Sequence, residues 1–281
     1  MPVILTQNAY GKSKVRLTKV TRRPDRHDLV EWSVDIQLEG DFAAAYADGD
    51  NRLVVATDTM KNTVYALARD IDLASPENFA LRLSEHFLAK YPQVSTAAIA
   101  IHEQAWQRID VDGQPHPHAF IGSGPERRVC RVARTRSGPH LRAGIEGMIV
   151  LKTANSAFRN FHHDEFRTLP DTDDRIMATE VSAEWPYEST SVDGNACFDL
   201  IRRTLLKTFA EHKSLGVQHT LYAMGEAALA ACSAIDEISL TMPNRHRLPI
   251  NLAPFNRTNP NEIFVATDEP HGLISGTFRR Q

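Results

Sequence analysis

The chain has 281 residues, of which 42% are hydrophobic and 24% charged, the composition of a globular protein with one large or two smaller domains. Its formal charge of -3 gives no overall basic field, which argues against a nucleic-acid-binding function. The sequence shows no signal peptide and no apolar run as long as a membrane span, so we expect a cytoplasmic protein without membrane contact.

The cysteines Cys130, Cys197 and Cys232 are odd in number, lie far apart and form no Cys-x-x-Cys motif. This pattern favours reduced thiols over a disulfide framework or a zinc site. It agrees with the expected intracellular location.

Two segments near the N-terminus, residues 14–20 and 30–38, alternate apolar and polar side chains around a turn-rich stretch. Such alternation predicts a β-hairpin with one buried face, on which we expect Val15, Leu17 and Val20. The hairpin would begin the first sheet.

The apolar run at residues 53–56 has the composition of a strand and ends at Thr57 and Asp58. Helical spacing predicts a helix over residues 59–69, with Thr57 or Asp58 at its N-cap. A strand that leads straight into a helix brings together a hydroxyl, a carboxylate and free backbone N–H groups, which suits a small, flat anion. An ordinary capped junction also explains these residues.

A second helix is predicted after Ser75, because serine is a favoured N-cap and Pro76 suits the first helical position. Residues 97–106 and 120–121 then flank a polar turn at residues 110–118, which predicts a further hairpin.

The second half of the chain repeats this order of elements without a residue-level repeat. We expect a hairpin at 129–135 and 144–152, a polar excursion at 153–174, strands at 176–185 and 235–242, helices at 198–209 and 218–232, and a closing strand pair at 249–252 and 262–265.

This order of elements predicts an α+β protein in which each antiparallel sheet carries a pair of helices on one face. We expect two domains, residues 1–137 and 138–281. Sheets of this kind expose edge strands, and closing them with a neighbour's sheet into a barrel predicts an oligomer.

Five polar patches could carry chemistry, and each also has a simpler structural explanation. Phe158 can stack on an aromatic ring, Arg175 can recognise a planar edge with two parallel bonds, and His246 can move protons. The alternatives are a loop anchor, a surface ion pair, a solvated lysine and simple helix capping. The patches centre on Lys12, on Phe158, on Arg175, on Val217 with Gln218, and on Asn244 with His246.

The close histidine pairs His116 with His118 and His162 with His163 invite a metal assignment. Neither pair has cysteine or acidic partners at zinc spacing, and the proline between His116 and His118 favours a place in the hairpin turn. We therefore predict no metal site. The chain also lacks a Gly-rich phosphate loop and the Gly-x-Ser-x-Gly and His-Glu-x-x-His motifs.

A series of short motifs runs through nearly the whole chain, and each motif alone is weak. They are Tyr10-Gly-Lys12, Val55-Ala-Thr-Asp58 with Lys61-Asn-Thr63, Asp112-Gly-Gln-Pro-His-Pro-His118, Leu151-Lys-Thr-Ala-Asn-Ser-Ala-Phe158, Asp174-Arg175-Ile176, Leu206-Lys-Thr-Phe-Ala-Glu211, Val217-Gln218 with Tyr222, and Met242-Pro-Asn-Arg-His246. In this order the series closely resembles the urate oxidase family (uricase, factor-independent urate hydroxylase).

The resemblance implies tandem tunnelling-fold (T-fold) domains and a homotetramer whose active sites are shared between subunits. It also implies that urate is oxidised by O₂ and water to 5-hydroxyisourate and hydrogen peroxide, without a cofactor. Lys12, Thr57 and His246 would handle protons, and Asn244 would hold water or O₂. The implied urate-binding residues are Thr57, Asp58, Phe158, Arg175, Val217, Gln218 and Asn244, with Thr57 and Asp58 reaching the pocket of a neighbouring subunit.

The chain departs from the family pattern at several points. Family members often have an aromatic residue after the stacking phenylalanine, whereas this chain has Arg159, and Lys152-Thr-Ala-Asn-Ser-Ala is a variant form of its motif. The C-terminal residues Phe278-Arg-Arg-Gln281 lack the Ser-Lys-Leu peroxisomal address, which favours a bacterial-type cytoplasmic enzyme.

Two other functions remain open at this point. One is a pterin- or purine-processing T-fold enzyme, such as a cyclohydrolase or an aldolase, although cyclohydrolase chemistry would favour a zinc-binding Cys/His set that the sequence lacks. The other is a non-catalytic purine-binding protein, which would bind urate without turning it over.

Overall fold

The computed structural model describes residues 3–267 and 269–281, and the chain divides into two compact units. Unit 1 runs to Gly144 and also takes in Pro186–Asn195, whereas unit 2 consists of Ile145–Trp185 and Ala196–Gln281. The division into two T-fold domains at residues 137 and 138 stays a prediction.

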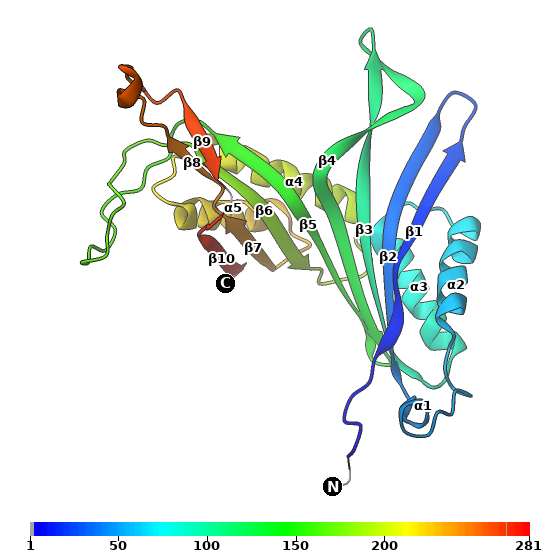
Figure 1. The fold of residues 1–281 in the computed structure, drawn as a ribbon. Coiled ribbons are helices and arrows are strands. Elements are labelled where there is room, and N and C mark those ends of the chain that lie inside the picture. Colours follow the sequence, from blue (N-terminus) through cyan, green and yellow to red (C-terminus); the bar gives the residue numbers. More distant parts are fainter. Residues whose placement is uncertain (1–2, 268) are drawn as a thin grey trace. The chain divides into compact units, whose positions relative to one another are not determined.

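Unit 1 is built on an antiparallel sheet in the order β1-β2-β3-β4 (Figure 1). Helices α2 and α3 pack on it, α2 against β1 and α3 against β3 and β4. The predicted order of strand pair, helix pair and strand pair is therefore confirmed, with one additional short helix. The elements are β1 (Tyr10–Arg22), β2 (His27–Gly40), α1 (Ala43–Ala47), α2 (Thr57–Asp70), α3 (Pro76–Lys90), β3 (Val94–Val111) and β4 (Gln114–Thr135).

The core of unit 1 includes apolar side chains that alternate with polar ones along the strands. Leu17 of β1 pairs with Trp32 of β2, Ile36 of β2 pairs with Ile99 of β3, and all four side chains are buried. Val20, which was predicted on the same face, is instead 39% exposed. The prediction was wrong because side chains alternate across a strand, so Val20 points away from the face of Leu17.

Unit 2 contains an antiparallel sheet in the order β5-β6-β7-β10, to which β5 contributes its residues from Ile145 onward. Helix α5 packs on β7 and β10, and Figure 1 shows α4 on the same side of this sheet as α5. Antiparallel strands with paired helices in both units confirm the α+β class. The elements are β5 (Gly138–Lys152), β6 (Met177–Pro186), α4 (Gly194–Glu211), α5 (Val217–Ala231), β7 (Glu237–Pro243) and β10 (Leu273–Arg279).

The closing strand pair near the C-terminus differs from the prediction. β8 (His246–Pro249) and β9 (Phe264–Thr267) form a separate two-stranded sheet, with the short helix η1 (Ala253–Phe255) between them. The partner of β7 is β10. No side chain of β10 is fully buried, and its sequence lacks the alternation of apolar and polar residues that predicts a strand.

Residues 53–56 do not form the predicted strand; they are a turn followed by an irregular segment. The backbone N–H of Val54 donates to Asn51 O at 3.0 Å, which closes the turn. Val55 is 5% exposed, and both of its backbone groups bond to the hydroxyl of Tyr10 instead of a neighbouring strand. Val55 is the one buried residue of this apolar run, whereas Leu53 is 42% exposed, so the run marks neither a paired strand nor a continuous buried segment.

The starts of α2 and α3 differ in how they are capped. Ala56 occupies the N-cap of α2 without a side-chain bond among the described residues, so Thr57 and Asp58 lie in the first turn and not at the cap. At α3 the prediction is confirmed, because Ser75 Oγ accepts a bond from Asn78 N at 3.2 Å and Pro76 is the first helical residue.

None of the helices in the described part of the chain has the length and apolar character needed to cross a membrane.

Candidate functional site

Two backbone connections in unit 2 bring Phe158 and Arg175 together. Phe158 and Thr172 exchange two backbone hydrogen bonds of 2.9 Å each, and Arg175 N donates to Ser156 O at 2.8 Å. As a result, the guanidinium carbon of Arg175 lies 4.9 Å from the centre of the Phe158 ring. The predicted stacking residue and the predicted bidentate cation are therefore neighbours.

The guanidinium of Arg175 is half-buried and has no hydrogen bond or ion pair with any side chain in the described part of the chain. Burial lowers the pKa of Arg175, because removal from water disfavours the charged form. An arginine nevertheless stays protonated at neutral pH. A partly desolvated cation without a protein anion is a good receptor for an anionic ligand.

A cavity of about 260 Å³ opens beside these two residues in unit 2. This volume lies just below the range of about 300–1,000 Å³ for drug-sized ligands, as suits a smaller molecule. Its lining includes four predicted site residues, namely Phe158, Arg175, Asn244 and His246. Asn244 is fixed by its backbone N–H, which donates to Gly272 O at 2.8 Å, and His246 begins β8 opposite Thr267.

The ring of Phe158 is supported by a second aromatic ring. Phe161 stacks on it with ring centres 4.7 Å apart and planes 9° from parallel. Phe158 lines the cavity, whereas Phe161 lies outside its lining among the described residues. The pair therefore gives Phe158 a fixed orientation at the cavity wall.

The start of α5 lies beside Phe158. Gly216 precedes the helix, and a Cβ atom placed there would be 3.7 Å from both Phe158 Cδ2 and Gln218 Oε1. Val217, the first helical residue, is buried, and Gln218 is exposed. Both lie outside the cavity lining among the described residues, so the structure places them next to Phe158 but not in the cavity wall.

Lys12 lies in unit 1 at an irregularity of β1. The strand register shifts between Lys12 and Val15, and Lys14 takes a positive φ of 55° while its N–H donates to Asp35 Oδ1 at 2.7 Å. Such a bulge changes the direction in which neighbouring side chains point. Gly11 is required next to it, since a Cβ there would lie 1.7 Å from Ile36 O.

Thr57 and Asp58 lie in the first turn of α2, also in unit 1. The carboxylate of Asp58 accepts bonds from Lys61 Nζ at 2.6 Å and Asn62 Nδ2 at 2.9 Å. Lys61 is the main cause of a lowered pKa at Asp58, and the charge of Lys12 makes a smaller contribution. Lys12 is therefore close enough to this turn of its own chain to act on it electrostatically.

Several residues that organise the site of unit 2 were not predicted. Asp174 Oδ1 accepts from Ser156 N at 3.0 Å and so joins the segment that carries Arg175 to the one that carries Phe158. Lys152 Nζ donates to His212 O at 2.6 Å at the end of α4. The bonded residues are 18 and 60 positions apart in the chain, so no local sequence pattern predicts these bonds. The one signal in the sequence was a charged side chain next to a loop, Asp174 in the first case and Lys152 in the second.

His212 and His219 form a second unpredicted contact, with ring centres 4.3 Å apart, on either side of the α4–α5 connection. Ser214 lies in that connection, and Ala157 N donates to its carbonyl oxygen at 2.8 Å. The imidazole Nε2 of His212 is buried without a hydrogen-bond partner in the described structure. Burial first, then His219 and Lys152, lowers the pKa of His212.

We expect His212 to make unfolding pH-dependent. Its pKa is lowered in the folded protein from the ordinary value of 6.5, so below pH 6.5 the unfolded chain binds the proton more readily. Stability is therefore fully present above that pH and is lost as the pH falls through it. The His212→Gln variant should show a smaller fall in Tm between pH 8 and pH 5.5 than the wild type.

Two comparisons make this measurement specific. Burial also lowers the pKa of His86, so only the difference between wild type and variant reports on His212. The exposed His140 provides the control, because His140→Gln should keep the wild-type pH dependence. An unchanged slope in His212→Gln would show that its imidazole does not cause the effect.

The close histidine pair His116 and His118 lies in β4. The turn is confined to Asp112 and Gly113, both with positive φ, so His116 and His118 belong to the strand and not to the turn as predicted. Their rings are 4.5 Å apart, and His118 N donates to His116 Nδ1 at 3.4 Å. Among the described residues, no group of three or more His, Cys, Asp or Glu side chains could hold a metal ion.

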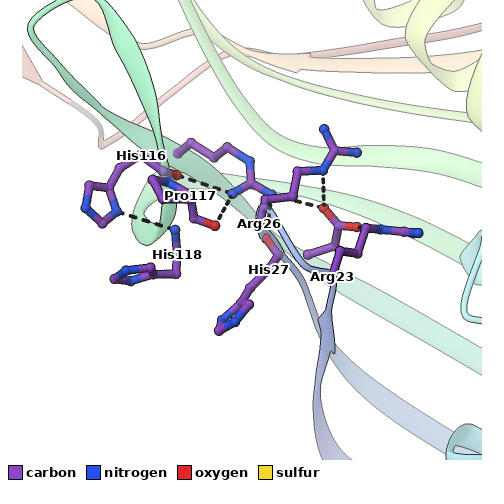
Figure 2. A network of polar contacts seen from close by, with 8 residues as sticks. Arg23, Arg26, His27, His116, Pro117 and His118 are labelled. Atoms are coloured by element: carbon purple, nitrogen blue, oxygen red, sulfur yellow. Dashed lines mark hydrogen bonds and ion pairs between the residues drawn. The ribbon is translucent and has the colours of Figure 1, made fainter.

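Arg108 connects the histidine segment to the β1–β2 hairpin. Figure 2 shows this network of polar contacts, with His116, Pro117 and His118 on one side and Arg23, Arg26 and His27 on the other. The guanidinium of Arg108 donates to Pro117 O at 2.8 Å, to Asp28 Oδ1 at 3.0 Å and to His27 O. Arg23 bonds the same carboxylate at 2.6 Å and is the main cause of a lowered pKa at Asp28. This network joins two hairpins within unit 1.

Arg159, which stands where members of the resembled family often have an aromatic residue, is exposed and forms an ion pair with Asp173. The substitution therefore leaves a charged pair on the loop next to Phe158.

Known proteins are similar to this chain over nearly its whole length. The family model described as Uricase matches residues 8–133 and 141–275. The uricase of Arthrobacter globiformis is 46% identical over 99% of this chain and 91% of its own length, and Uricase-2 of Phaseolus vulgaris is 40% identical over 98% and 95%. The crystal structure of the Arthrobacter globiformis uricase has a TM-score of 0.95 and covers 100% of this chain and 96% of that chain.

The matching model and the full-length relatives agree with the ordered motifs and confirm the T-fold architecture. The chain belongs to the uricase family.

Proposed function

We propose that this protein oxidises urate with O₂ and water to 5-hydroxyisourate and hydrogen peroxide, without a cofactor. Its membership of the uricase family supports the reaction. The observation that carries the proposal for the site is the half-buried guanidinium of Arg175, 4.9 Å from the ring of Phe158 at a cavity wall. A planar anion needs both a flat apolar surface and an unpaired cation.

Binding would use the edges and the face of the urate ring. Urate is flat and acidic, with carbonyl and N–H groups around its rim. Arg175 would form two parallel bonds to one edge, and the amide of Gln218 would donate and accept at another. Phe158 would stack on the ring, and the start of α5 at Val217 would offer a backbone N–H.

The residues proposed to remove a proton from urate are Lys12, Thr57 and His246. Lys12 would act as the general base through the hydroxyl of Thr57, and His246 would support the relay. Two electrons and two protons then pass from urate to O₂ and give hydrogen peroxide. Water held by Asn244 supplies the hydroxyl group of the product, so urate itself provides the electrons that a flavin or metal provides elsewhere.

The proposal includes a homotetramer in which Thr57 and Asp58 of one protomer complete the pocket of a neighbour. Edge strands such as β1 and β10 support it, because an exposed strand edge can pair with a strand of another subunit and so close the sheets into a barrel. A cytoplasmic location is a further part of the proposal.

The function is tested with purified protein, urate and air after treatment with a chelator. The proposal predicts that urate is lost and that one hydrogen peroxide appears for each urate consumed, at the same rate with and without the chelator. Tight urate binding without turnover would support a non-catalytic purine-binding protein. Turnover that requires an added metal would contradict a cofactor-independent reaction.

The carboxylate of Asp174 lines the same cavity as Phe158 and Arg175 and should affect substrate binding. Asp174→Ala removes the acceptor of the Ser156 N–H bond, which joins the segments of Phe158 and Arg175, and should raise KM for urate by about tenfold. Asp174→Asn keeps an acceptor oxygen and should stay within about threefold of wild type in steady-state assays. Equal KM values for wild type and Asp174→Ala would remove Asp174 from the support of the site.

A further inference from the structure

The hydroxyl of Tyr10 makes two bonds to one distant residue. It accepts from the backbone N–H of Val55 at 2.7 Å and donates to the backbone oxygen of Val55 at 3.1 Å. The two residues are 45 positions apart in the chain. Val55 is 5% exposed, so water cannot readily replace either bond, and an unpaired buried backbone group is costly.

The ring and the hydroxyl of Tyr10 are both held in place. The ring packs edge-on against Phe42, with ring centres 4.8 Å apart and planes at 88°. Burial raises the pKa of Tyr10, so the phenol stays protonated at neutral pH and continues to donate to Val55 O. Tyr10 is thus a fixed connection and not a mobile surface side chain.

The connection joins the two segments that carry the proposed base and its hydroxyl partner. Tyr10 begins β1, two residues before Lys12, and Val55 lies two residues before Thr57, which begins α2. Ala56 provides no side-chain cap within the described structure, so the bonds to Val55 fix the entry of the chain into α2. The effect of Lys12 on the pKa of Asp58 agrees with close approach of the two segments.

We propose that Tyr10 is a positioning residue for proton removal, whose hydroxyl sets the distance between Lys12 and Thr57. The inference rests on the proposed roles of Lys12 and Thr57 in urate oxidation. Proton transfer requires heavy atoms about 2.6–3.2 Å apart, and a displacement of about 1 Å is enough to lower a rate by about 100-fold. Substrate binding by Phe158 and Arg175 depends on other contacts in unit 2.

The test variant is Tyr10→Phe, which keeps the ring against Phe42 and removes both hydrogen bonds. The matched control is Tyr46→Phe, because Tyr46 is 53% exposed and its hydroxyl makes one long bond of 3.4 Å to Ala9 O. We expect kcat of Tyr10→Phe to fall at least about tenfold, while KM for urate and the affinity for a non-oxidisable urate analogue stay within about threefold. Tyr46→Phe should match the wild type.

A double variant distinguishes positioning from a general loss of structure. If Tyr10 acts through Thr57, adding Tyr10→Phe to Thr57→Ala should lower kcat by less than about twofold further, because the two changes disable one step. Full additivity, an unchanged kcat in Tyr10→Phe, or a parallel loss of kcat, analogue affinity and Tm would each overturn the proposal.

Backbone hydrogen exchange of residues 53–58 gives a readout that needs no substrate. Faster exchange in Tyr10→Phe than in wild type and Tyr46→Phe supports the connection, and unchanged exchange overturns it. Absence of urate oxidation by the wild type would instead count against the proposed function, so the two failures are distinguishable.

Discussion

Replacing Arg175 with alanine should weaken the binding of urate and of a non-oxidisable analogue by at least about 30-fold, the lower end of what loss of a buried, charged partner costs. The guanidinium is half-buried and has no protein anion among the described residues, so its charge is available to the ligand. Titration calorimetry with the analogue measures this directly, because it does not depend on turnover.

Two further variants define what Arg175 contributes. Arg175→Lys keeps the charge but loses the planar pair of donors, so its affinity should lie between those of wild type and Arg175→Ala. Arg159→Ala is the control, because Arg159 is exposed and pairs with Asp173. Wild-type affinity in Arg175→Ala, or an equal loss in Arg159→Ala, would exclude the proposed role of Arg175.

Lys12→Met and Thr57→Ala should each lower kcat by at least about tenfold, as expected for loss of general-base catalysis. Neither change should lower Tm much, since Lys12 and Thr57 are only half-buried and lie outside the apolar core. Steady-state kinetics and thermal unfolding of the same preparations provide both numbers.

The chain offers a close control for each of these variants. Lys14 is exposed on the same strand and Thr59 is exposed on the same helix, so Lys14→Met and Thr59→Ala should retain wild-type kcat. Unchanged turnover in both Lys12→Met and Thr57→Ala would refute the assigned base.

The hairpins and helices could be predicted because their side chains follow the period of the element. Ser75 with Pro76 marked the start of α3 correctly, since capping is decided by a few neighbouring residues. The run at residues 53–56 failed because the partner of Val55 is a tyrosine hydroxyl 45 residues away. The composition of a short run gives no information about a hydrogen-bond partner so far away in the chain.

The sequence predicted which residues belong to the site better than how these residues are arranged in space. Phe158, Arg175, Asn244 and His246 line one cavity, as expected of a common site. The stacking of Phe161 on Phe158 was not predicted, because it depends on the folding of a loop without periodic structure. The role of Lys12 as the base stays a prediction, and so do the roles of Thr57 and Asp58 across a subunit boundary, which depend on assembly.

We propose that a planar anion sits against Phe158 between Arg175 and Gln218, with Lys12 and Thr57 in reach of its ring. The most direct test is a crystal structure of the assembled protein with a non-oxidisable urate analogue. We predict the analogue stacked on Phe158, two bonds from the Arg175 guanidinium to one edge, and the Thr57 hydroxyl within hydrogen-bond distance of the ring. An analogue bound elsewhere, or one that no protomer's Thr57 approaches, would contradict this arrangement.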